Sequence, residues 1–408
     1  MYNLSYLISQ IENSPTLALN EIATRLREGG ADVINLGIGE PLNEFPESVL
    51  TSTGEILRSR RVKYSPTSGS QSLKEAIQNY TQEHYGRKPG LGNITVTVGA
   101  KQALYNLLQI MLDPEDEVII FSPYWVSYPE MIKLARGVPV LVETNHDFIP
   151  DMEAIKAAVT GKTKAILLNT PNNPTGAVYP PELVAALVDF CESGEIFLVM
   201  DDIYHQLVFD PAQWVPGYVF TSKPIDKSHL IIINGISKTY GMTGFRIGWA
   251  IGPDPVIRAM NKLQSHSTSG ASALLQGGAL GALKDGSDTL INLREFIKTN
   301  RDILIGELKK IKGVKVAEPG GTFYCFPDFS LIHPDSQELA KLLLEKAFLA
   351  TVPGIAFGRE GFLRLSYTCS TDQIKESAAR IRWAIDPESS PQIVIGSQEY
   401  NRDWELTS

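Results

Sequence analysis

The chain has few of the residues that build disulfide frameworks and metal sites. It contains only three cysteines, Cys191, Cys325 and Cys369, and six histidines in 408 residues. An odd number of widely spaced cysteines cannot form a complete disulfide framework, which favours a reducing, cytoplasmic location. No cysteine pair and no histidine pair has the spacing of a zinc site. We therefore expect no metal, and a chemistry that depends on other residue types.

Basic residues in excess and long apolar segments are also lacking. Lysine and arginine together number 37 against 46 acidic residues, a net charge of -9, so we expect no basic face for nucleic acid. The longest apolar runs, such as residues 230–233, are far too short to span a bilayer. Residues 1–15 lack the basic start and the apolar segment of a signal peptide. These absences argue against nucleic-acid and membrane partners.

The composition and the pattern of the chain predict a globular α/β protein. Apolar residues make up 43% and charged residues 20%, and the length allows two domains. Short apolar runs alternate with helical patterns such as 101–111, 151–159 and 181–191. The predicted strands are 94–98, 117–121, 139–143, 165–169, 196–201, 229–234 and 246–250. This order predicts a large domain with a mostly parallel seven-stranded sheet, whose ligands bind at the carboxyl ends of the strands.

The remaining segments predict a second, smaller α/β domain. We place the large domain at 42–288 and the small domain at 1–41 and 289–385. Short strands are expected around 314–316, 322–326 and 362–366, before a final helix at 371–384. Residues 386–408 hold proline, serine and isolated apolar residues without a period, so we expect an extended or partly disordered tail.

One segment, residues 234–249 (NGISKTYGMTGFRIGW), combines a lysine and an arginine in an unusual setting. Lys238 lies just beyond a predicted buried strand, and Arg246 follows eight residues later. A lysine among apolar and small residues loses its proton more easily, and a neutral amine can form a Schiff base with an aldehyde. Arg246 could then hold a phosphate on the same cofactor. For a single lysine, a solvated loop position would be the simpler interpretation.

This segment resembles the lysine signature of class I pyridoxal-phosphate-dependent aminotransferases of fold type I, with aspartate aminotransferase as the nearest type. Other motifs similar to those of the family follow in the expected order, over roughly residues 15–385. They are 64–69 (YSPTSG), 98–103 (VGAKQA), 122–125 (SPYW), 169–176 (NTPNNPTG), 201–204 (DDIY), 320–324 (GGTFY) and 364–367 (RLSY). The resemblance implies pyridoxal 5′-phosphate as the cofactor.

The resemblance assigns roles around the ring of that cofactor. Asp201, at the end of a hydrophobic strand, pairs with the protonated pyridine nitrogen, which makes the ring an electron sink. Tyr204 and Asn173 hydrogen-bond the phenolic oxygen, and Trp125 stacks on the ring. Lys238, Tyr204 and Asp201 are thus the predicted catalytic residues.

A second group of residues is predicted to hold the phosphate. Gly99, Ala100 and Lys101 lie where a helix begins, so that free backbone N–H groups and the helix dipole favour an anion there. Ser237 and Arg246 are further expected donors. In the family, the residue that Tyr64 resembles reaches the phosphate of a neighbouring subunit, which implies a homodimer with shared active sites.

The predicted substrates are an amino acid and a 2-oxo acid. Arg364 resembles the arginine that grips the α-carboxylate with two donors, and Gly39 offers a backbone N–H to the same group. Trp125 and Asn173 also line the predicted substrate site. Lys101 could attract a dicarboxylic substrate such as aspartate or glutamate. The chain departs from the family pattern at 42–46, 68–71, Gly235 and Gly270, and most of these positions surround the predicted substrate entrance.

The expected reaction is a ping-pong transamination in which Lys238 carries a proton between Cα and C4′ of the cofactor. The same cofactor chemistry also supports a specialised lyase or cyclase that acts on a modified amino acid in a biosynthetic pathway. Production of a 2-oxo acid, coupled to recovery of the amine on a second one, separates these alternatives. A non-catalytic regulator or binding module of the same fold is a further alternative, which retention of the predicted site residues disfavours.

Overall fold

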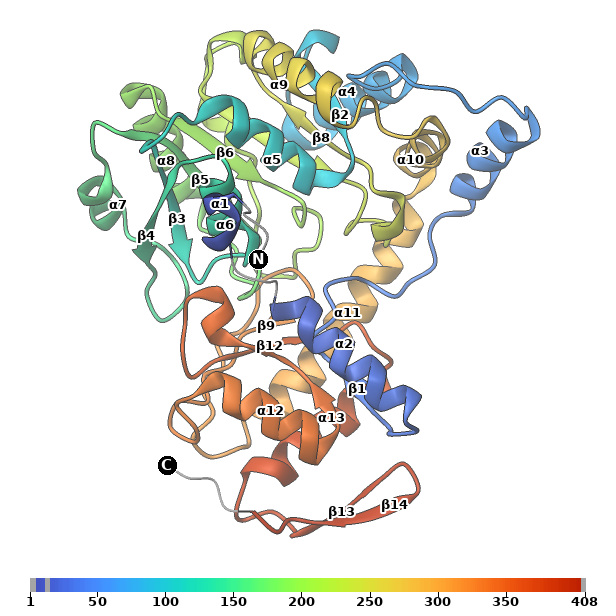
Figure 1. Ribbon diagram of the computed structural model, residues 1–408, viewed down its shortest axis with the longest axis vertical. Helices are drawn as coiled ribbons and strands as arrows, with labels where there is room; N and C mark the ends of the chain where they lie inside the picture. Colours follow the sequence, from blue (N-terminus) through green and yellow to red (C-terminus); the bar gives the residue numbers. More distant parts are fainter. Residues whose placement is uncertain (1–4, 12–14, 405–408) are drawn as a thin grey trace.

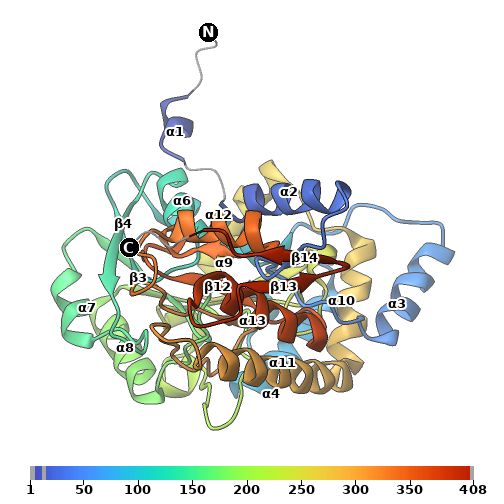
Figure 2. The ribbon, with the colours of Figure 1, turned by 90° about the horizontal axis from the view of Figure 1, so that it is seen from below.

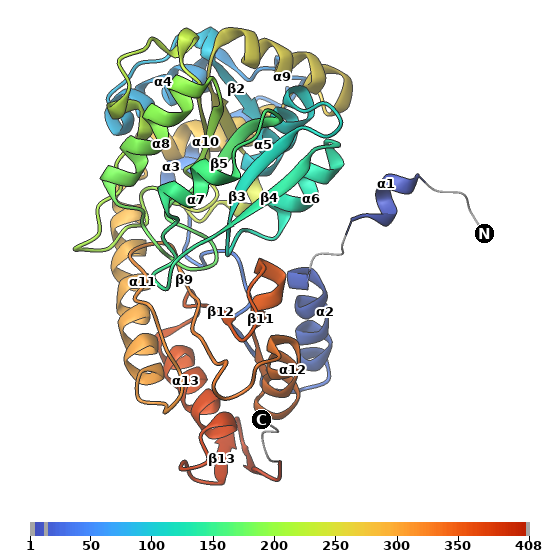
Figure 3. The ribbon, with the colours of Figure 1, turned by 90° about the vertical axis from the view of Figure 1, so that its left-hand side faces the viewer.

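The computed structural model describes residues 5–11 and 15–404, and its ribbon has two lobes (Figure 1). The upper lobe contains the large sheet, and the lower lobe contains short strands packed against helices. The long helix α11 (Ser287–Leu308) extends from one lobe into the other, as the side view in Figure 3 also shows. Within the described ranges, no helix combines the length and the hydropathy needed to cross a bilayer.

A seven-stranded sheet forms the centre of the upper lobe, in the order β2-β8-β7-β6-β5-β3-β4. β8 runs in the direction opposite to all the other strands of this sheet, and the others run in the same direction. The predicted mostly parallel sheet is therefore confirmed. The strands are β2 (Ile94–Thr97), β3 (Glu117–Ser122), β4 (Val138–Glu143), β5 (Thr163–Asn169), β6 (Phe197–Asp201), β7 (Leu230–Gly235) and β8 (Gly248–Ile251). Their ends differ from the predicted ends by no more than two residues.

Helices cover both faces of this sheet. They are α3 (Glu47–Arg58), α4 (Gln71–Tyr85), α5 (Gly99–Met111), α6 (Ser127–Leu134), α7 (Met152–Ala158), α8 (Pro181–Gly194), α9 (Asp254–Ser267) and α10 (Ala273–Asp285). Several begin at the residues the sequence suggests: Asp151 caps α7 by accepting a hydrogen bond from the Ala154 amide at 3.0 Å.

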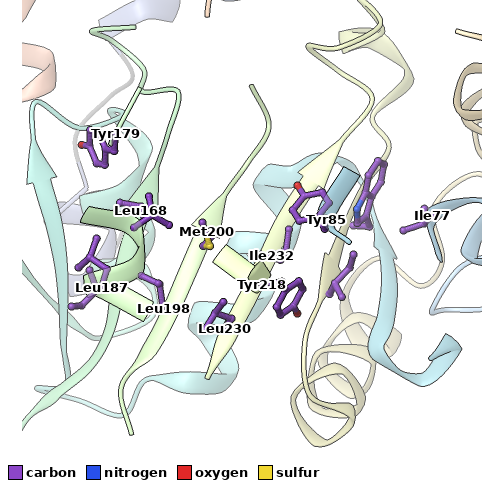
Figure 4. Packing of buried hydrophobic residues seen from close by; sticks show 14 of the residues in the cluster. Ile77, Tyr85, Leu168, Tyr179, Leu187, Leu198, Met200, Tyr218, Leu230 and Ile232 are labelled. Carbon is purple, nitrogen blue, oxygen red and sulfur yellow. The ribbon is translucent and has the colours of Figure 1, made fainter. Parts of the chain in front are cut away.

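The sheet is apolar on both faces because helices cover both. Figure 4 shows this packing on one face, where Leu168, Met200 and Ile232 from β5, β6 and β7 belong to one buried cluster with Leu187 of α8. These four side chains are fully buried. The apolar runs therefore fix the strands, and Asn169 and Asp201 stand at the carboxyl ends of two of them.

The lower lobe combines the N-terminal segment with the C-terminal third of the chain. A three-stranded sheet has the order β11-β12-β9, with β9 (Tyr324–Cys325), β11 (Val352–Pro353) and β12 (Leu363–Ser366). Beside it, β1 (Ile34–Asn35) pairs in parallel with β10 (Leu349–Ala350). The helices here are α2 (Pro15–Glu28), α12 (Ser336–Ala347) and α13 (Thr371–Ile385), while α1 (Tyr6–Ser9) precedes α2.

The domain boundaries at 41/42 and 288/289 stay a prediction, and residues 1–4 and 12–14 of the predicted small domain lie outside the described residues. The strand expected at 314–316 is wrong. Lys315 forms only an isolated bridge with Asp328, in which the two residues exchange both backbone hydrogen bonds, and the pairing does not continue on either side.

The prediction for the C-terminal tail is also wrong. Residues 392–401 form a hairpin of β13 (Gln392–Ile395) and β14 (Gln398–Asn401). Its signal was present in the sequence, because Gly396-Ser397 is a two-residue turn between segments of strand-forming residues, and Gly396 has φ +60°. The last four residues of the predicted tail, 405–408, lie outside the described part of the chain.

Candidate active site

A cavity of about 260 Å³ opens where the carboxyl ends of the large sheet meet the lower lobe. Nearly all of the residues singled out from the sequence line it: Gly39, Ala100, Lys101, Trp125, Asn173, Asp201, Tyr204, Ser237, Lys238, Arg246 and Arg364. Gly99 lies directly behind Arg246. Tyr64 is the exception, because it does not line the cavity and its side chain is 97% exposed.

The topology of the sheet explains this convergence. Asn169 and Asp201 end the parallel strands β5 and β6, and Lys238 follows the end of β7. Because β8 is antiparallel, Arg246, which lies shortly before the start of this strand, comes to the same edge as these strand ends. Three segments, around Asn169, around Asp201 and at 234–249, therefore present polar side chains to one space.

Lys238 has a partly buried side chain whose amine donates a hydrogen bond to the Gly39 carbonyl oxygen at 2.5 Å. Burial lowers the pKa of this amine to about 8, and the positive charges of Arg364 and Arg246 act in the same direction, while Glu40 opposes them. A substantial fraction of the amine is therefore neutral and nucleophilic near physiological pH.

Asp201 presents one open carboxylate oxygen. The Tyr128 hydroxyl donates to Oδ2 at 2.7 Å, whereas Oδ1 is buried and has no hydrogen-bond partner among the described residues. Burial raises the pKa of the carboxyl group to about 6, and the hydrogen bond from Tyr128 limits the rise. A buried carboxylate with one open oxygen at the wall of a cavity fits a cationic N–H group of a bound molecule.

A chain of amides links the ends of β5 and β6. The side chain of Asn169 donates to the Asp201 carbonyl oxygen at 2.8 Å and accepts from the Asn173 amide at 2.9 Å. Asn173 in turn lies 3.3 Å from the Tyr204 hydroxyl, through its Nδ2. Asn169 therefore fixes the positions of Asp201 and Asn173 relative to each other. Asn173 in turn positions the Tyr204 hydroxyl.

The predicted phosphate site, here called the phosphate cup, is formed by Gly99, Ala100, Lys101, Ser237 and Arg246. It requires a close approach between the start of α5 and the segment that leads into β8. Gly99 begins α5 with φ +78°, and a Cβ atom there would lie 2.7 Å from Nη2 of Arg246. A Cβ on Gly248 would lie 2.3 Å from the Ala100 amide nitrogen. Both glycines thus allow Arg246 and the start of β8 to contact the N-terminus of α5. An arginine beside free helix N–H groups is a suitable site for a phosphate.

Two further side chains complete the wall of the cup. The Lys101 amine lies 3.2 Å from the Ser127 hydroxyl and 4.8 Å from the centre of the Trp125 ring. Burial, with a smaller contribution from Arg246, lowers the pKa of Lys101. Ser237, next to Lys238, is buried in the cavity wall.

Arg364 is buried without an acidic partner among the described salt bridges. Its guanidinium donates to the Gly37 carbonyl oxygen at 2.9 Å and to Asn173 Oδ1 at 3.3 Å, and lies 4.4 Å from the Tyr324 ring centre. Its Nε has no partner within the described residues. A buried guanidinium with unused donor capacity fits a carboxylate that approaches from the cavity.

The sequence reasoning missed four residues that shape this site. Tyr128 and Asn169 orient the carboxylate and the backbone of Asp201, while Gly37 and Tyr324 contact Arg364. Signals for all four existed. Tyr128 follows Trp125 by three residues, close to one helical turn, Asn169 and Tyr324 lie inside motifs already singled out, and Gly37 lies two residues before Gly39.

Comparison with known proteins identifies the family. The family model described as aminotransferase class I and II matches residues 31–381. The chain belongs to this family. It is 40% identical over 390 residues to the probable aspartate/prephenate aminotransferase of Thermus aquaticus, covering 94% of this chain and all of that protein. It is 39% identical to the aspartate aminotransferase of Bacillus subtilis, over 95% of this chain and all of the relative.

Solved structures agree with the sequence comparison. The aspartate aminotransferase of Thermus thermophilus with maleate aligns with a TM-score of 0.89 and 39% identity, over 94% of this chain and all of that chain. The protein is thus an enzyme, a pyridoxal-phosphate-dependent aminotransferase that uses amino acid and keto acid substrates, and the predicted fold, cofactor and activity are confirmed. The lyase, cyclase and regulator alternatives receive no support.

The cavity fits pyridoxal phosphate. The protonated nitrogen of a pyridine ring needs a hydrogen-bond acceptor, and the open oxygen of Asp201 can serve as one. The phosphate needs N–H donors, which the site at Gly99 and Arg246 provides. Lys238 lies in the same cavity with an amine of lowered pKa.

The hydrogen bond from Tyr128 to Asp201 generates a test. Changing Tyr128→Phe removes a donor that favours the charged carboxylate, so the pKa of Asp201 rises above its value of about 6 and the charge is lost at a higher pH. We expect cofactor affinity near pH 6 to fall about tenfold, which is the order of one hydrogen bond to a charged group, with a smaller loss at pH 8.

The measurement is a titration of the apo protein with pyridoxal phosphate across this pH range. Tyr179→Phe is the matched control, because Tyr179 is equally buried but does not line the cavity. Equal losses in the two variants, or a loss independent of pH, would show that Tyr128 does not act through the charge of Asp201.

Proposed function

We propose that this cavity binds pyridoxal phosphate and transfers the amino group of an L-amino acid to a 2-oxo acid, with Lys238 as the residue that holds the cofactor and moves the proton. One observation carries the proposal: an amine with a pKa lowered to about 8 shares the cavity with a buried carboxylate whose second oxygen is open. Pyridoxal phosphate supplies an aldehyde that takes up the amino group and a ring that accepts electrons from Cα.

Different residues around the cavity would bind different parts of the cofactor. Asp201 would hold a proton at the ring nitrogen, Asn173 and Tyr204 would donate to the phenolic oxygen, and Trp125 would cover the ring. The phosphate is held by the set Gly99, Ala100, Lys101, Ser237 and Arg246. These contacts to the ring and the phosphate would keep the aldehyde of the cofactor close to Lys238.

Lys238 would perform the proton transfer once the amino acid has taken its place on the cofactor. Its neutral Nζ would take up the proton from Cα of the substrate, and pyridoxal phosphate, when bound, would supply C4′ as the atom that receives it. Arg364, which donates to Asn173, and the Gly39 amide would hold the α-carboxylate and so place Cα near Lys238, whose amine donates to the Gly39 carbonyl oxygen. In the structure, the Gly39 carbonyl oxygen holds the lysine amine by a hydrogen bond, which keeps it in the cavity.

We further propose a dicarboxylic substrate such as aspartate or glutamate. The relatives named above carry aspartate or prephenate in their names, and both compounds have two carboxylates. Lys101 is the candidate for the second carboxylate, because its amine lies over Trp125 at the wall of the cavity.

The active protein would be a cytoplasmic homodimer with shared active sites. Tyr64 is almost fully exposed and lies in the segment between α3 and α4, so its hydroxyl is free to reach the phosphate in a second copy of the chain. The three cysteines are all free and buried, which suits a reducing compartment.

Replacing Lys238 tests the proposal directly. We expect Lys238→Ala to lose the visible absorption of the bound cofactor and to lower turnover by several orders of magnitude, because the only proposed proton carrier is removed. Spectra and coupled assays of 2-oxo acid production measure both effects. Lys262→Ala is the control, since Lys262 is exposed on α9 and remote from the cavity residues. A fully active Lys238→Ala protein would refute the assignment.

Replacing Lys101 tests the substrate class. Lys101→Met keeps much of the apolar stem over Trp125 but removes the charge, so we expect the KM for aspartate to rise about tenfold or more. The KM for an uncharged aliphatic amino acid should stay the same or fall. A parallel rise for both substrates would instead assign Lys101 to cofactor binding alone.

A further inference from the structure

The C-terminal hairpin is attached to the lower lobe by its inner face. β13 pairs with β14 in the register Ile393–Tyr400 and Val394–Glu399, so side chains alternate between the two faces. Ile395 is 3% exposed, whereas Val394 is 64% exposed. In Figure 2, β13 and β14 lie across the lower lobe, beside α13. The matched family model ends at residue 381, so the hairpin lies beyond it.

Arg402 and two tryptophans anchor the hairpin to the end of α13. The Arg402 guanidinium donates to the carbonyl oxygens of Trp383, at 2.9 Å, and of Asp386. Trp383 donates to the Pro391 carbonyl oxygen at 3.0 Å, and its ring meets Trp404 edge-on at 5.0 Å. A guanidinium on the last carbonyl groups of a helix satisfies acceptors that the helix itself leaves open.

The tip and the second strand of the hairpin reach the N-terminal segment. A Cβ added to Gly396 would lie 3.4 Å from the Asp32 side chain, so the turn of the hairpin lies next to Asp32. Tyr400 packs on Phe348 at a ring distance of 5.4 Å. The buried Arg380 of α13 donates to Asp32 Oδ2 at 2.9 Å and to its carbonyl oxygen at 2.7 Å.

The segment that follows Asp32 leads to Gly37 and Gly39, which line the active site. Ile34 and Leu36 donate their amides to the carbonyl oxygens of Phe348 and Ala350, at 3.0 and 2.8 Å. One residue later the Gly37 carbonyl oxygen accepts from Arg364, and the Gly39 carbonyl oxygen accepts from Lys238. The strand β1 that carries this segment has only two residues, so its own hydrogen bonds hold it weakly.

We propose that the C-terminal hairpin is a positioning element for the active site. Through Asp32 and Phe348 it fixes the segment 32–39, and thereby places the backbone of Gly37 and Gly39 against Arg364 and Lys238. The inference rests on the proposed function in one respect: Arg364 and Gly39 are taken to hold the substrate carboxylate. A hairpin that only capped α13 would reach that segment through Arg380 alone, and not through Phe348.

The test removes the hairpin from the cofactor-loaded enzyme. A chain that ends at Asp386 should exchange the Ile34 and Leu36 amide hydrogens faster, because the segment opens locally more often. We expect the KM for the amino acid to rise about threefold or more, since small displacements of positioning groups weaken binding. The affinity for pyridoxal phosphate should change less than twofold, because its proposed holders lie in the other lobe.

Point variants keep the test decisive if the shortened chain fails to fold. Tyr400→Ala removes the contact with Phe348, and Val394→Ala is its matched control on the outer face of the same hairpin. The first should reproduce both effects in weaker form, and the second should show neither. Unchanged exchange at Ile34 and Leu36 with unchanged KM would overturn the proposal, even if the melting temperature falls.

The two proposals fail in different ways. If no amino acid is turned over by the complete enzyme, the proposed substrate assignment fails, but amide exchange at Ile34 and Leu36 still decides the role of the hairpin. If turnover is normal and the exchange is insensitive to the hairpin, only the positioning role is lost.

Discussion

The site depends on the burial of an acidic group, the Asp201 carboxylate, and a basic group, the Lys238 amine, that do not form a salt bridge with each other. Asp201 keeps one oxygen open, and the Lys238 amine turns to the Gly39 carbonyl oxygen instead of forming a salt bridge with that carboxylate. Burial moves both pKa values toward neutrality, to about 6 and about 8. The carboxylate can therefore stay charged while part of the amine is neutral, which is the combination an electron-accepting ring and a nucleophile require.

The architecture makes this arrangement possible because the polar groups stand at the ends of apolar strands. β7 is buried over its whole length, and β5 and β6 are buried toward their carboxyl ends, so Asn169, Asp201 and the segment before Lys238 are held at one edge. The antiparallel strand β8 adds Arg246 to that edge. The lower lobe closes the cavity from the other side with Arg364 and Tyr324.

Much of this could be predicted from the sequence, and the reasons are physical. The strands of the large sheet are continuous apolar runs, so their positions were evident, and the cavity residues lie in motifs at the strand ends. Tyr128 was missed because its role depends on a contact with Asp201 across 73 residues of sequence. The hairpin was missed because its strands are short and its turn, Gly396-Ser397, was not weighed against the polar composition around it.

The central claim is that the amine at Lys238 is the one that bonds to the aldehyde of pyridoxal phosphate. Borohydride reduction of the loaded protein, followed by peptide mass mapping, tests this claim most directly. The account predicts one added pyridoxyl phosphate group per chain, on the peptide that contains Lys238. An adduct on Lys101, which lines the same cavity, or the absence of any adduct would contradict it.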